Sequence, residues 1–365
     1  MSLKCGIVGL PNVGKSTLFN CLSNAKAQSA NFPFCTIEPN IGTITVPDDR
    51  LNQLAKLLKP ESVVPTNIEI VDIAGLVKGA SNGEGLGNKF LANIRETNAI
   101  IHVLRCFDDE NITHVEGSVN PIRDKEIIDL ELQLKDLETL EKLKSKNIRS
   151  AETGNKSSKI LISIIDRCIS FLEQGKSLRS FDFSNEDYLL ISNFNLLTIK
   201  PVLYLCNIDE QSINQTNKYV NEVKRTVNDE GAQILTIATS IESEIAELEN
   251  NDDRLMFLNE IGLSEPGVNN LITSTYQLLN LQTFFTAGKK EVRAWTIKKN
   301  SYAPQAAGVI HTDFEKGFIR AEVIAFDDFI SLGSELACKE AGKLSVEGKN
   351  YMVNDGDIMH FRFNV

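Results

Sequence analysis

A segment near the N-terminus has the residue types and spacing of a phosphate-binding loop. Gly9 to Ser16, with the sequence GLPNVGKS, match the pattern G-x-x-x-x-G-K-[ST]. The apolar run Cys5–Val8 precedes the segment, and a helix-like run follows from Ser16. Glycines in such a loop tolerate the positive φ values that turn backbone N–H groups toward phosphate oxygens. We therefore expect Lys15 to reach the β and γ phosphates of a nucleotide and the Ser16 hydroxyl to bind Mg²⁺.

Two further positions have the types that a nucleotide-bound magnesium ion needs. Asp72 and Gly75 form a D-x-x-G motif at the end of the apolar run Asn67–Asp72. Asp72 is expected to act on Mg²⁺, directly or through water, and the Gly75 N–H to sense the γ-phosphate. Thr36 lies between the two motifs, where its hydroxyl can bind Mg²⁺ and order the loop around a triphosphate. D-x-x-G is common in turns and Thr36 could be an ordinary turn residue, but the P-loop ahead favours the phosphate site.

The loop after the candidate strand Pro201–Cys206 stands where G proteins carry N-K-x-D to read guanine. There the aspartate accepts from guanine N1–H and the 2-amino group, and the lysine packs over the base. Here Ile208 replaces the lysine and Glu210 the aspartate, after Asn207. The longer glutamate carboxylate would crowd the edge of the base. Selectivity for guanine depends on the hydrogen bonds between the aspartate and the base, so it is lost when those hydrogen bonds cannot form. The loop therefore favours ATP over GTP; a register with Asp209 as guanine reader stays open.

No motif supplies the side chain that orients the attacking water. Leu76 follows D-x-x-G where many GTPases place a glutamine, and leucine cannot hold water. His114, in a loop after the candidate strand Ala99–Cys106, is our candidate instead. A lone loop histidine is more often simply exposed, so both interpretations of His114 stay open. A monovalent cation such as K⁺, held by Asn12 against the phosphates, is a further hypothesis.

The expected site therefore draws on several segments of the chain. The expected nucleotide contacts are Asn12, Val13, Gly14, Lys15, Ser16, Thr17, Gly75, Asn207, Ile208, Glu210 and Ser240. The expected catalytic residues are Lys15 and His114, and the expected Mg²⁺ ligands are Ser16, Thr36 and Asp72.

The elements that must position these residues follow an α/β pattern. The candidate strands Cys5–Val8, Asn67–Asp72 and Ala99–Cys106 each run into loop residues at their C-terminal ends. The pattern resumes with Pro201–Cys206 and Gln233–Ala238. Near-continuous apolar strands separated by helices indicate a parallel sheet covered on both faces.

Two amphipathic runs interrupt this α/β pattern. Apolar residues with three-four spacing lie in Ile127–Leu137 and again in Leu161–Leu172, which Gly175 stops. The polar stretch Ser150–Ser158 separates the two runs, which predicts an antiparallel helical hairpin inserted in one α/β domain. Its tip gathers the basic residues Lys142, Lys144, Lys146, Arg149, Lys156 and Lys159. Such a tip suggests contact with a phosphate backbone, although charge for solubility alone is an equal alternative.

The C-terminal part and the overall composition narrow the class of protein. Short strands (Glu291–Ile297, Phe318–Val323, Asp357–Phe363) and a helix near Pro304–His311 predict a small α+β domain.

The net charge is −11, so any RNA contact must come from a local basic patch. Seven cysteines without a C-x-x-C pair indicate reduced thiols. No apolar stretch approaches the roughly 18 residues that span a bilayer, so we expect a cytoplasmic protein without membrane contact.

Taken together, these residues resemble the YchF family, the Obg-like ATPases of the translation-factor class of P-loop proteins. The resemblance covers essentially the whole chain. Its most specific segments are 6–17, 31–40, 72–80 and 354–357. It implies a G domain (1–122 and 199–279) interrupted by a coiled-coil hairpin (123–198) and followed by a ubiquitin-like (β-grasp) TGS domain (280–365).

The resemblance also implies an activity. It implies ATP preference through an N-x-x-E motif, matched by Asn207 and Glu210, and a hydrophobic residue, Leu76, in place of the catalytic glutamine. It implies ribosome association, and its loop histidine matches His114. Our leading hypothesis is a slow, Mg²⁺-dependent, monomeric ATPase that contacts the ribosome or its RNA through the hairpin and the TGS domain. The alternatives are a GTPase of the Obg type and an RNA- or protein-binding scaffold with incidental hydrolysis.

Overall fold

The computed structural model describes residues 3–29, 41–73, 86–248 and 250–364. The chain divides into two compact units. The first comprises Met1–Thr43 and Glu69–Leu271, and the second Ile44–Ile68 and Ile272–Val365. The expected contacts Thr36 and Gly75 lie outside the described residues, as does Leu76.

The first unit is built around a sheet whose strand order is β2-β4-β1-β5-β6-β7 and whose strands β4, β1, β5, β6 and β7 run parallel. The strands are β1 (Lys4–Val8), β2 (Ile41–Thr45), β4 (Asn67–Asp72), β5 (Ala99–Arg105), β6 (Val202–Asn207) and β7 (Gln233–Ile237). The pairs β1–β4, β1–β5, β5–β6 and β6–β7 are all parallel. Every residue of β5 is buried, as expected of a central strand covered on both faces. The predicted parallel sheet is confirmed for β4, β1, β5, β6 and β7.

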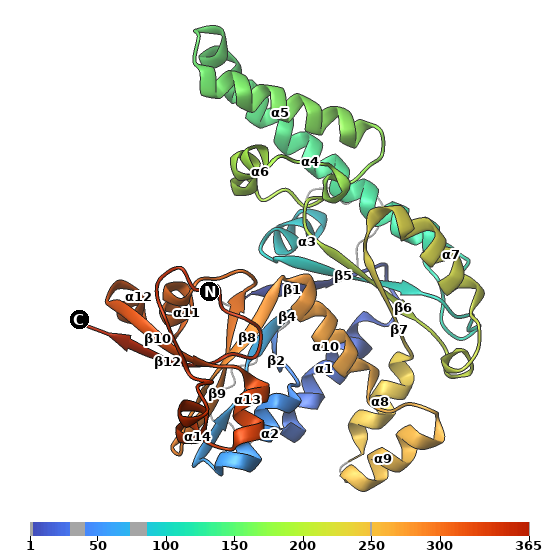
Figure 1. Ribbon diagram of the computed structural model, residues 1–365. Coiled ribbons are helices and arrows are strands. Elements are labelled where there is room, and N and C mark those ends of the chain that lie inside the picture. The colour runs from blue at the N-terminus through green and yellow to red at the C-terminus, as the bar shows by residue number, and fades with distance from the viewer. Residues whose placement is uncertain (1–2, 30–40, 74–85, 249, 365) are drawn as a thin grey trace. The chain divides into compact units, whose positions relative to one another are not determined.

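Helices accompany this sheet (Figure 1). They are α1 (Lys15–Ser29), α3 (Leu86–Arg95), α7 (Lys218–Val227), α8 (Thr239–Glu247), α9 (Asn251–Glu260) and the first residues of α10 (Gly267–Leu278), whose remainder belongs to the second unit. The start of α7 illustrates why these helices begin where they do. Asn217 precedes it in an extended conformation, and its side chain accepts hydrogen bonds from Tyr219 N and Val220 N. The helix-like run predicted over 216–228 is thus confirmed.

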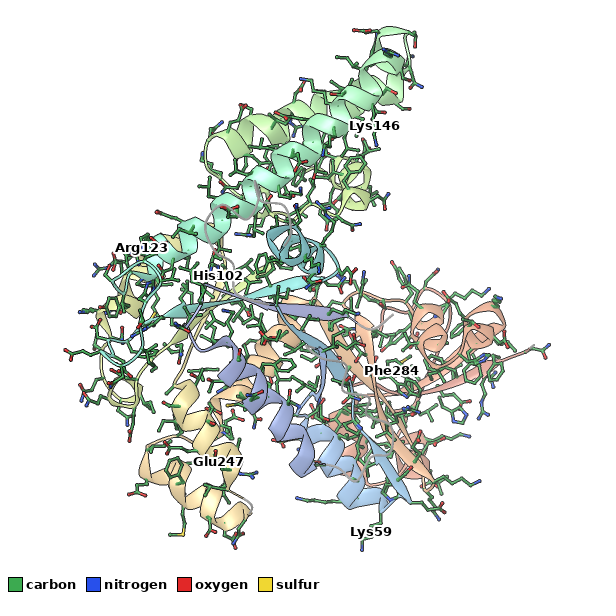
Figure 2. All side chains as sticks on the ribbon, turned by 180° about the vertical axis from the view of Figure 1, so that it is seen from behind. Lys59, His102, Arg123, Lys146, Glu247 and Phe284 are labelled. Atoms are coloured by element: carbon green, nitrogen blue, oxygen red, sulfur yellow. The ribbon has the colours of Figure 1, made fainter. Side chains whose placement is uncertain are left out.

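The inserted hairpin consists of α4 (Pro121–Glu152) and α5 (Lys156–Glu173). The Asn120 side chain accepts from Arg123 N and caps α4, whereas Asn155 accepts from Ser158 N and caps α5. Between the helices Leu140, Ile164, Ile165, Cys168 and Leu172 form a buried core. The predicted hairpin is confirmed, with a shorter turn than the polar stretch suggested, because Asn155 already caps the second helix. Figure 2 shows Lys146 toward its tip and Arg123 at its base.

A buried carboxylate holds the hairpin to the segment that leads back to the sheet. Asp136 of α4 accepts from Leu197 N at 2.8 Å, from Thr198 N at 2.7 Å and from Thr198 Oγ1 at 2.6 Å. Burial raises the pKa of Asp136, which these hydrogen bonds oppose. The segment between α5 and β6 also contains α6 (Asn185–Ile191) and the 3₁₀ turns η1 (Leu178–Ser180) and η2 (Ser192–Phe194).

The second unit contains a mixed sheet with strand order β11-β10-β12-β8-β9-β3. Its strands are β3 (Ser62–Val64), β8 (Leu281–Ala287), β9 (Glu291–Lys298), β10 (Phe318–Ile324), β11 (Ser345–Glu347) and β12 (Ile358–Phe363). Its helices are α2 (Asp49–Leu58), α11 (Ala303–Ile310), α12 (Thr312–Lys316), α13 (Phe326–Leu332) and α14 (Glu335–Glu340). The hairpin β8–β9, the helix α11 and the placement of β12 between β10 and β8 give the ubiquitin-like β-grasp topology. The expected fold of the C-terminal part is confirmed.

The segment Ile44–Ile68 belongs to this second unit by its contacts, although it precedes the hairpin in sequence. Its strand β3 pairs parallel with β9. The guanidinium of Arg50 donates to Asp355 at 2.8 Å and to Asp48 at 2.8 Å. The sequence places this segment within the first part of the G domain (1–122) and does not predict that it packs with the C-terminal residues.

Candidate nucleotide-binding site

The phosphate-binding loop lies between β1 and α1 and needs glycine at its second conserved position. Gly14 has a φ of +98°, and a Cβ there would collide with the side-chain nitrogen of Asn207. Asn12 also has a left-handed conformation, with a φ of 61°. Val13 is buried, whereas Ser16 and Thr17, in the first turn of α1, are exposed. The loop therefore presents the start of α1 to a ligand, which suits an anion.

Lys15 is turned inward onto its own loop. Its Nζ donates to the carbonyl oxygen of Leu10 at 2.6 Å, and the residue is only 8% exposed. Burial lowers the pKa of Lys15 to about 8, and the nearby Asp72 carboxylate opposes this effect. An ammonium group held by one carbonyl in a desolvated loop gains strongly from anionic phosphate oxygens.

Asp72 provides the observation that bears on a metal ion. Its Oδ1 is buried and has no hydrogen-bond partner among the described residues. Burial raises the pKa of Asp72, and Lys15 opposes the rise. A buried oxygen without a partner is costly, and a cation bound there would remove that cost. Within the described ranges no group of three or more His, Cys, Asp or Glu side chains is placed so that it could hold a metal ion.

Asn207 connects three parts of the site. Its Nδ2 donates to Val13 O at 2.9 Å, and its Oδ1 accepts from Thr239 N at 3.1 Å. The residue is 2% exposed at the end of β6. It therefore fixes the P-loop against the start of α8, where Ser240 is exposed. The sequence predicts Asn207 as a base contact, and that prediction does not include this bracing role or Thr239.

The residues expected to contact the base differ in whether they already form hydrogen bonds within the protein. Ile208 is buried, and its backbone N–H donates to Ile237 O at 3.0 Å. The Asp209 carboxylate accepts from Ser212 N at 3.0 Å and caps the 3₁₀ turn η3 (Glu210–Ile213). Glu210 is exposed, and no hydrogen bond or ion pair involves its side chain in the described part of the chain. The geometry thus leaves Glu210, rather than Asp209, available to a ligand.

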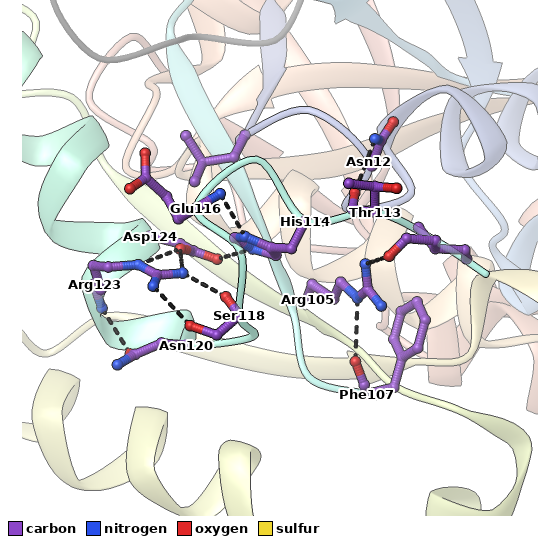
Figure 3. A network of polar contacts seen from close by, with 12 residues as sticks. Asn12, Arg105, Phe107, Thr113, His114, Glu116, Ser118, Asn120, Arg123 and Asp124 are labelled. Carbon is purple, nitrogen blue, oxygen red and sulfur yellow. Dashed lines mark hydrogen bonds and ion pairs between the residues drawn. The ribbon is translucent and has the colours of Figure 1, made fainter. Parts of the chain in front are cut away.

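His114 is buried rather than exposed, which corrects the ordinary expectation for a loop histidine. It is 7% exposed, and its Nε2 lies 2.8 Å from Asp124 Oδ2 in the first turn of α4 (Figure 3). The backbone N–H of Glu116 donates to His114 Nδ1 at 3.1 Å. Because Nδ1 accepts that hydrogen bond, the proton of the neutral ring lies on Nε2 and is donated to Asp124. His114 has no free lone pair in this arrangement.

The loop that carries His114 is fixed at several points. The Arg105 guanidinium, 1% exposed at the end of β5, donates to Phe107 O at 3.1 Å, to Asp109 O at 3.0 Å and to Ile112 O at 2.8 Å. Asn12 Nδ2 of the P-loop donates to Thr113 O at 3.1 Å (Figure 3). The loop therefore joins the P-loop to the base of the hairpin. Sequence reasoning missed Arg105, although an arginine that ends an otherwise apolar strand is a signal for such anchoring.

Taken together, a P-loop after the first strand of a parallel sheet, an Asp72 carboxylate beside it and a base loop after β6 define a nucleotide-binding domain of the P-loop GTPase fold. Two family models match the chain. One, described as "50S ribosome-binding GTPase", matches residues 4–137. The other, YchF-GTPase_C, described as "Protein of unknown function (DUF933)", matches residues 281–364.

Full-length relatives and a solved structure narrow this class to one family. The chain is 54% identical to a Pasteurella multocida protein and 51% identical to one from Bacillus subtilis, both named "Ribosome-binding ATPase YchF", over 100% of each chain. The solved structure of the Schizosaccharomyces pombe YchF GTPase superposes with a TM-score of 0.90 at 40% identity and covers 99% of this chain and 98% of that one. The chain belongs to the YchF family. Among the residues described, none of the helices combines the length and the apolar character needed to cross a membrane.

Proposed function

We propose that the protein is a Mg²⁺-dependent nucleoside-triphosphate hydrolase that prefers ATP over GTP and acts as a regulatory ATPase on the ribosome. The observation that carries the ATP preference is the state of the base loop. The Asp209 carboxylate already caps η3. The exposed Glu210 occupies the position at which a guanine-binding protein would have the shorter aspartate. The name of the two relatives that match over their whole length, "Ribosome-binding ATPase YchF", supports the same assignment.

The P-loop residues would bind and polarise the phosphates. Lys15 would exchange the Leu10 carbonyl for the β and γ phosphates, and the loop amides between Val13 and Thr17 would donate to phosphate oxygens. Ser16, Asp72 and Thr36 would hold Mg²⁺, which when bound neutralises charge on the phosphates. The buried Asp72 Oδ1, which has no hydrogen-bond partner in the described part of the chain, supports this role. The K⁺ ion suggested beside Asn12 stays a prediction.

His114 would orient the attacking water only after it leaves its present partners. Both ring nitrogens are engaged, one by Asp124 and the other by Glu116 N–H. Since Asp124 belongs to α4, a movement of the hairpin base would change the hold on His114. This relation supports a slow basal ATPase whose rate responds to what the hairpin binds, which is the regulatory part of the proposal.

The hairpin tip would contact ribosomal RNA. Lys142 and Lys144 form ion pairs with Glu138 and Asp166. The remaining basic residues of the tip are exposed, and no ion pair involves them within the described ranges: Lys146, Arg149, Lys156 and Lys159. Cations without counterions at the end of a long hairpin suit a phosphate backbone. Contact through the C-terminal unit and a monomeric state complete the proposal.

Sedimentation with purified ribosomes tests this assignment. The variant Lys146→Gln/Arg149→Gln removes two tip charges, and Lys224→Gln/Arg225→Gln removes the same charges from exposed positions of α7. We expect the tip variant to bind more weakly and to lower the slope of log affinity against log salt by about two, and the α7 variant to match the wild type. Equal effects of both variants would contradict the tip contact. Binding that is the same with ATP, ADP or no nucleotide would favour the scaffold alternative instead.

A further inference from the structure

The second unit contains a cavity that the nucleotide chemistry does not use. Its volume is about 620 Å³, within the roughly 300–1,000 Å³ typical of ligand pockets. The end of β8, the turn after it, β9, β10, β12 and the helices α11 to α14 contribute residues to its lining. Its walls are largely apolar and include Trp295, Ile310, Phe314, Met359, Phe361 and Phe363.

The cavity exists because the sheet divides at this point. β8 and β12 run parallel, yet a single register pair, Ile358 with Phe285, joins these two described strands. On its other side β12 pairs with β10 along its length, and β8 pairs with β9 along all of its own. Beyond the single pair, β12 diverges from β8 (Figure 1). The gap therefore lies where the two neighbouring strands separate, between the last residues of β8 after Phe285 and the part of β12 that follows Ile358.

Backbone hydrogen-bonding groups face this gap. Phe285 N donates to Asp357 O at 2.8 Å, which shows which residues of each strand turn toward the other. Backbone groups alternate between the two sides of a strand, so Ala287 and Phe361, two and four residues farther on, also turn toward the gap. No backbone hydrogen bond joins them. Their N–H and C=O groups are open to a strand placed between them.

Several side chains around the gap already have partners. The Trp295 indole N–H donates to Thr286 Oγ1 at 2.9 Å, and the Arg293 guanidinium lies over the indole ring at 4.4 Å. Phe314 and Phe363 stack with ring centroids 3.7 Å apart. The lining also carries both signs of charge, from Lys289, Lys290, Glu291, Glu322 and Glu335. A polyanion such as RNA has no single-sign surface to follow here, whereas apolar walls with open backbone groups match a polypeptide.

We propose that this cavity is a binding site for an extended segment of a partner protein, which enters as an additional strand between β8 and β12. The segment pairs its main chain with Ala287 and Phe361, and places apolar side chains against the aromatic wall that contains Trp295. This strand-addition site is separate from the nucleotide site and does not depend on its proposed function. Specificity comes from the pockets for alternate side chains, as in other β-augmentation sites.

The only tryptophan of the chain reports on this site directly. The probe is the peptide acetyl-Thr-Val-Thr-Val-Thr-amide, and its control is the same peptide N-methylated at every inner amide, which cannot pair as a strand. We expect the first peptide to change Trp295 fluorescence with a saturable isotherm below 5 mM and to shift the Phe361 amide resonance. We expect no saturable change with the N-methylated peptide. Absence of a saturable change with the first peptide would overturn the proposal, as would equal binding of both, which would indicate an apolar small-molecule cavity.

A matched pair of variants locates the binding. Gly288 lines the cavity, and a Cβ there would have one atom within 4 Å, Glu291 O at 3.7 Å, so Gly288→Leu adds a bulky side chain at a lining position where the Cβ itself makes only an ordinary contact. Gly348 has nothing within 4 Å of its position and is not a lining residue, so Gly348→Leu is its control. Both variants should melt like the wild type. Peptide affinity should fall at least tenfold in Gly288→Leu and stay unchanged in Gly348→Leu; equal affinities in the two variants would contradict the location.

Discussion

His114 Nε2 and Asp124 Oδ2 lie 2.8 Å apart, and both side chains are almost completely buried. The histidine belongs to the loop that contacts the P-loop through Thr113, and the aspartate to the first turn of the hairpin. Arg123 also donates to Asp124, with Nη2 3.0 Å from Oδ1. The residue expected to act on water is therefore held by the element expected to contact the ribosome.

This relation predicts opposite effects of two substitutions on ATP hydrolysis. Asp124→Asn weakens the hold on His114 at nearly constant shape, so the basal rate without ribosomes should rise several-fold. His114→Ala should lower it by roughly 10²–10⁴ if the residue acts as general base or water-orienting group. The double variant should be as slow as His114→Ala alone. If Asp124→Asn is instead as slow as His114→Ala, Asp124 orients the histidine productively, and the restraint described here is wrong.

Gly14 provides a test of the contact between the P-loop and Asn207. At Gly14 an alanine would have to adopt a φ of +98°, and its Cβ would collide with Asn207 Nδ2. At Gly117 an alanine would have to adopt a φ of +75°, but no atom lies within 4 Å of its Cβ. Both changes carry the roughly 1–2 kcal/mol cost of a left-handed non-glycine residue. Only Gly14→Ala should also weaken nucleotide binding, by tenfold or more, in a calorimetric titration. Equal nucleotide affinities of the two variants would show that the close approach does not matter.

Asp72 should be needed for the response to magnesium. The variant Asp72→Asn keeps the shape but loses the carboxylate, so Mg²⁺-dependent hydrolysis should fall at least a hundredfold, and chelation with EDTA should have little further effect. Glu69→Gln on the same strand, whose carboxylate pairs with Lys4 at 3.6 Å, serves as the control and should keep its Mg²⁺ response. An Asp72→Asn variant with an unchanged Mg²⁺ titration curve would remove Asp72 from the metal site.

A buried charge cluster at the hairpin base predicts a pH-dependent stability difference. Burial alone would raise the pKa of Asp129, but Arg179 and Lys125 reverse this and hold the pKa below its usual value. A depressed carboxyl pKa contributes stability above the unfolded-state pKa near 4, and that contribution is lost as pH falls through the lower folded-state pKa. Asp129→Asn also leaves two buried cations short of a counterion, so we expect a loss of about 3–5 kcal/mol at pH 7.

Urea unfolding of the wild type and Asp129→Asn at pH 7 and at pH 3 measures this difference. The gap between the two proteins should be largest at pH 7 and should shrink at pH 3, which lies below the unfolded-state pKa near 4, because there the unfolded wild-type chain binds a proton at this carboxyl. A gap that is the same at both pH values would mean that the charge of Asp129 is not what stabilises the base of the hairpin.

The sequence predicts most of what positions the site, for physical reasons that are local. Long apolar strands such as β5 and the amphipathic helices of the hairpin are specified by their own periodicity. The short strands β3 and β11, with 3 residues each, carry too little pattern to predict. The capping of η3 by the Asp209 carboxylate likewise cannot be predicted from the sequence, because it depends on the backbone conformation of the loop.

The relations that escape the sequence are those between distant residues. Arg50 and Asp355 meet across a separation of 305 residues, and nothing in either local pattern indicates the pairing. His114 and Asp124 are only 10 residues apart, yet their contact depends on how the loop folds back onto α4. In both cases side-chain types are compatible with many partners, and the tertiary fold selects one.

The preference for ATP is tested most directly by equilibrium binding of ATP and of GTP, measured side by side with Mg²⁺ at physiological salt. The wild type should bind ATP at least tenfold more tightly than GTP, a difference of about 1.4 kcal/mol. The variant Ile208→Lys/Glu210→Asp, which restores the guanine-reading residues, should shift the preference toward GTP. A wild type that prefers GTP, or a variant that leaves the ratio unchanged, would contradict the account of the base loop.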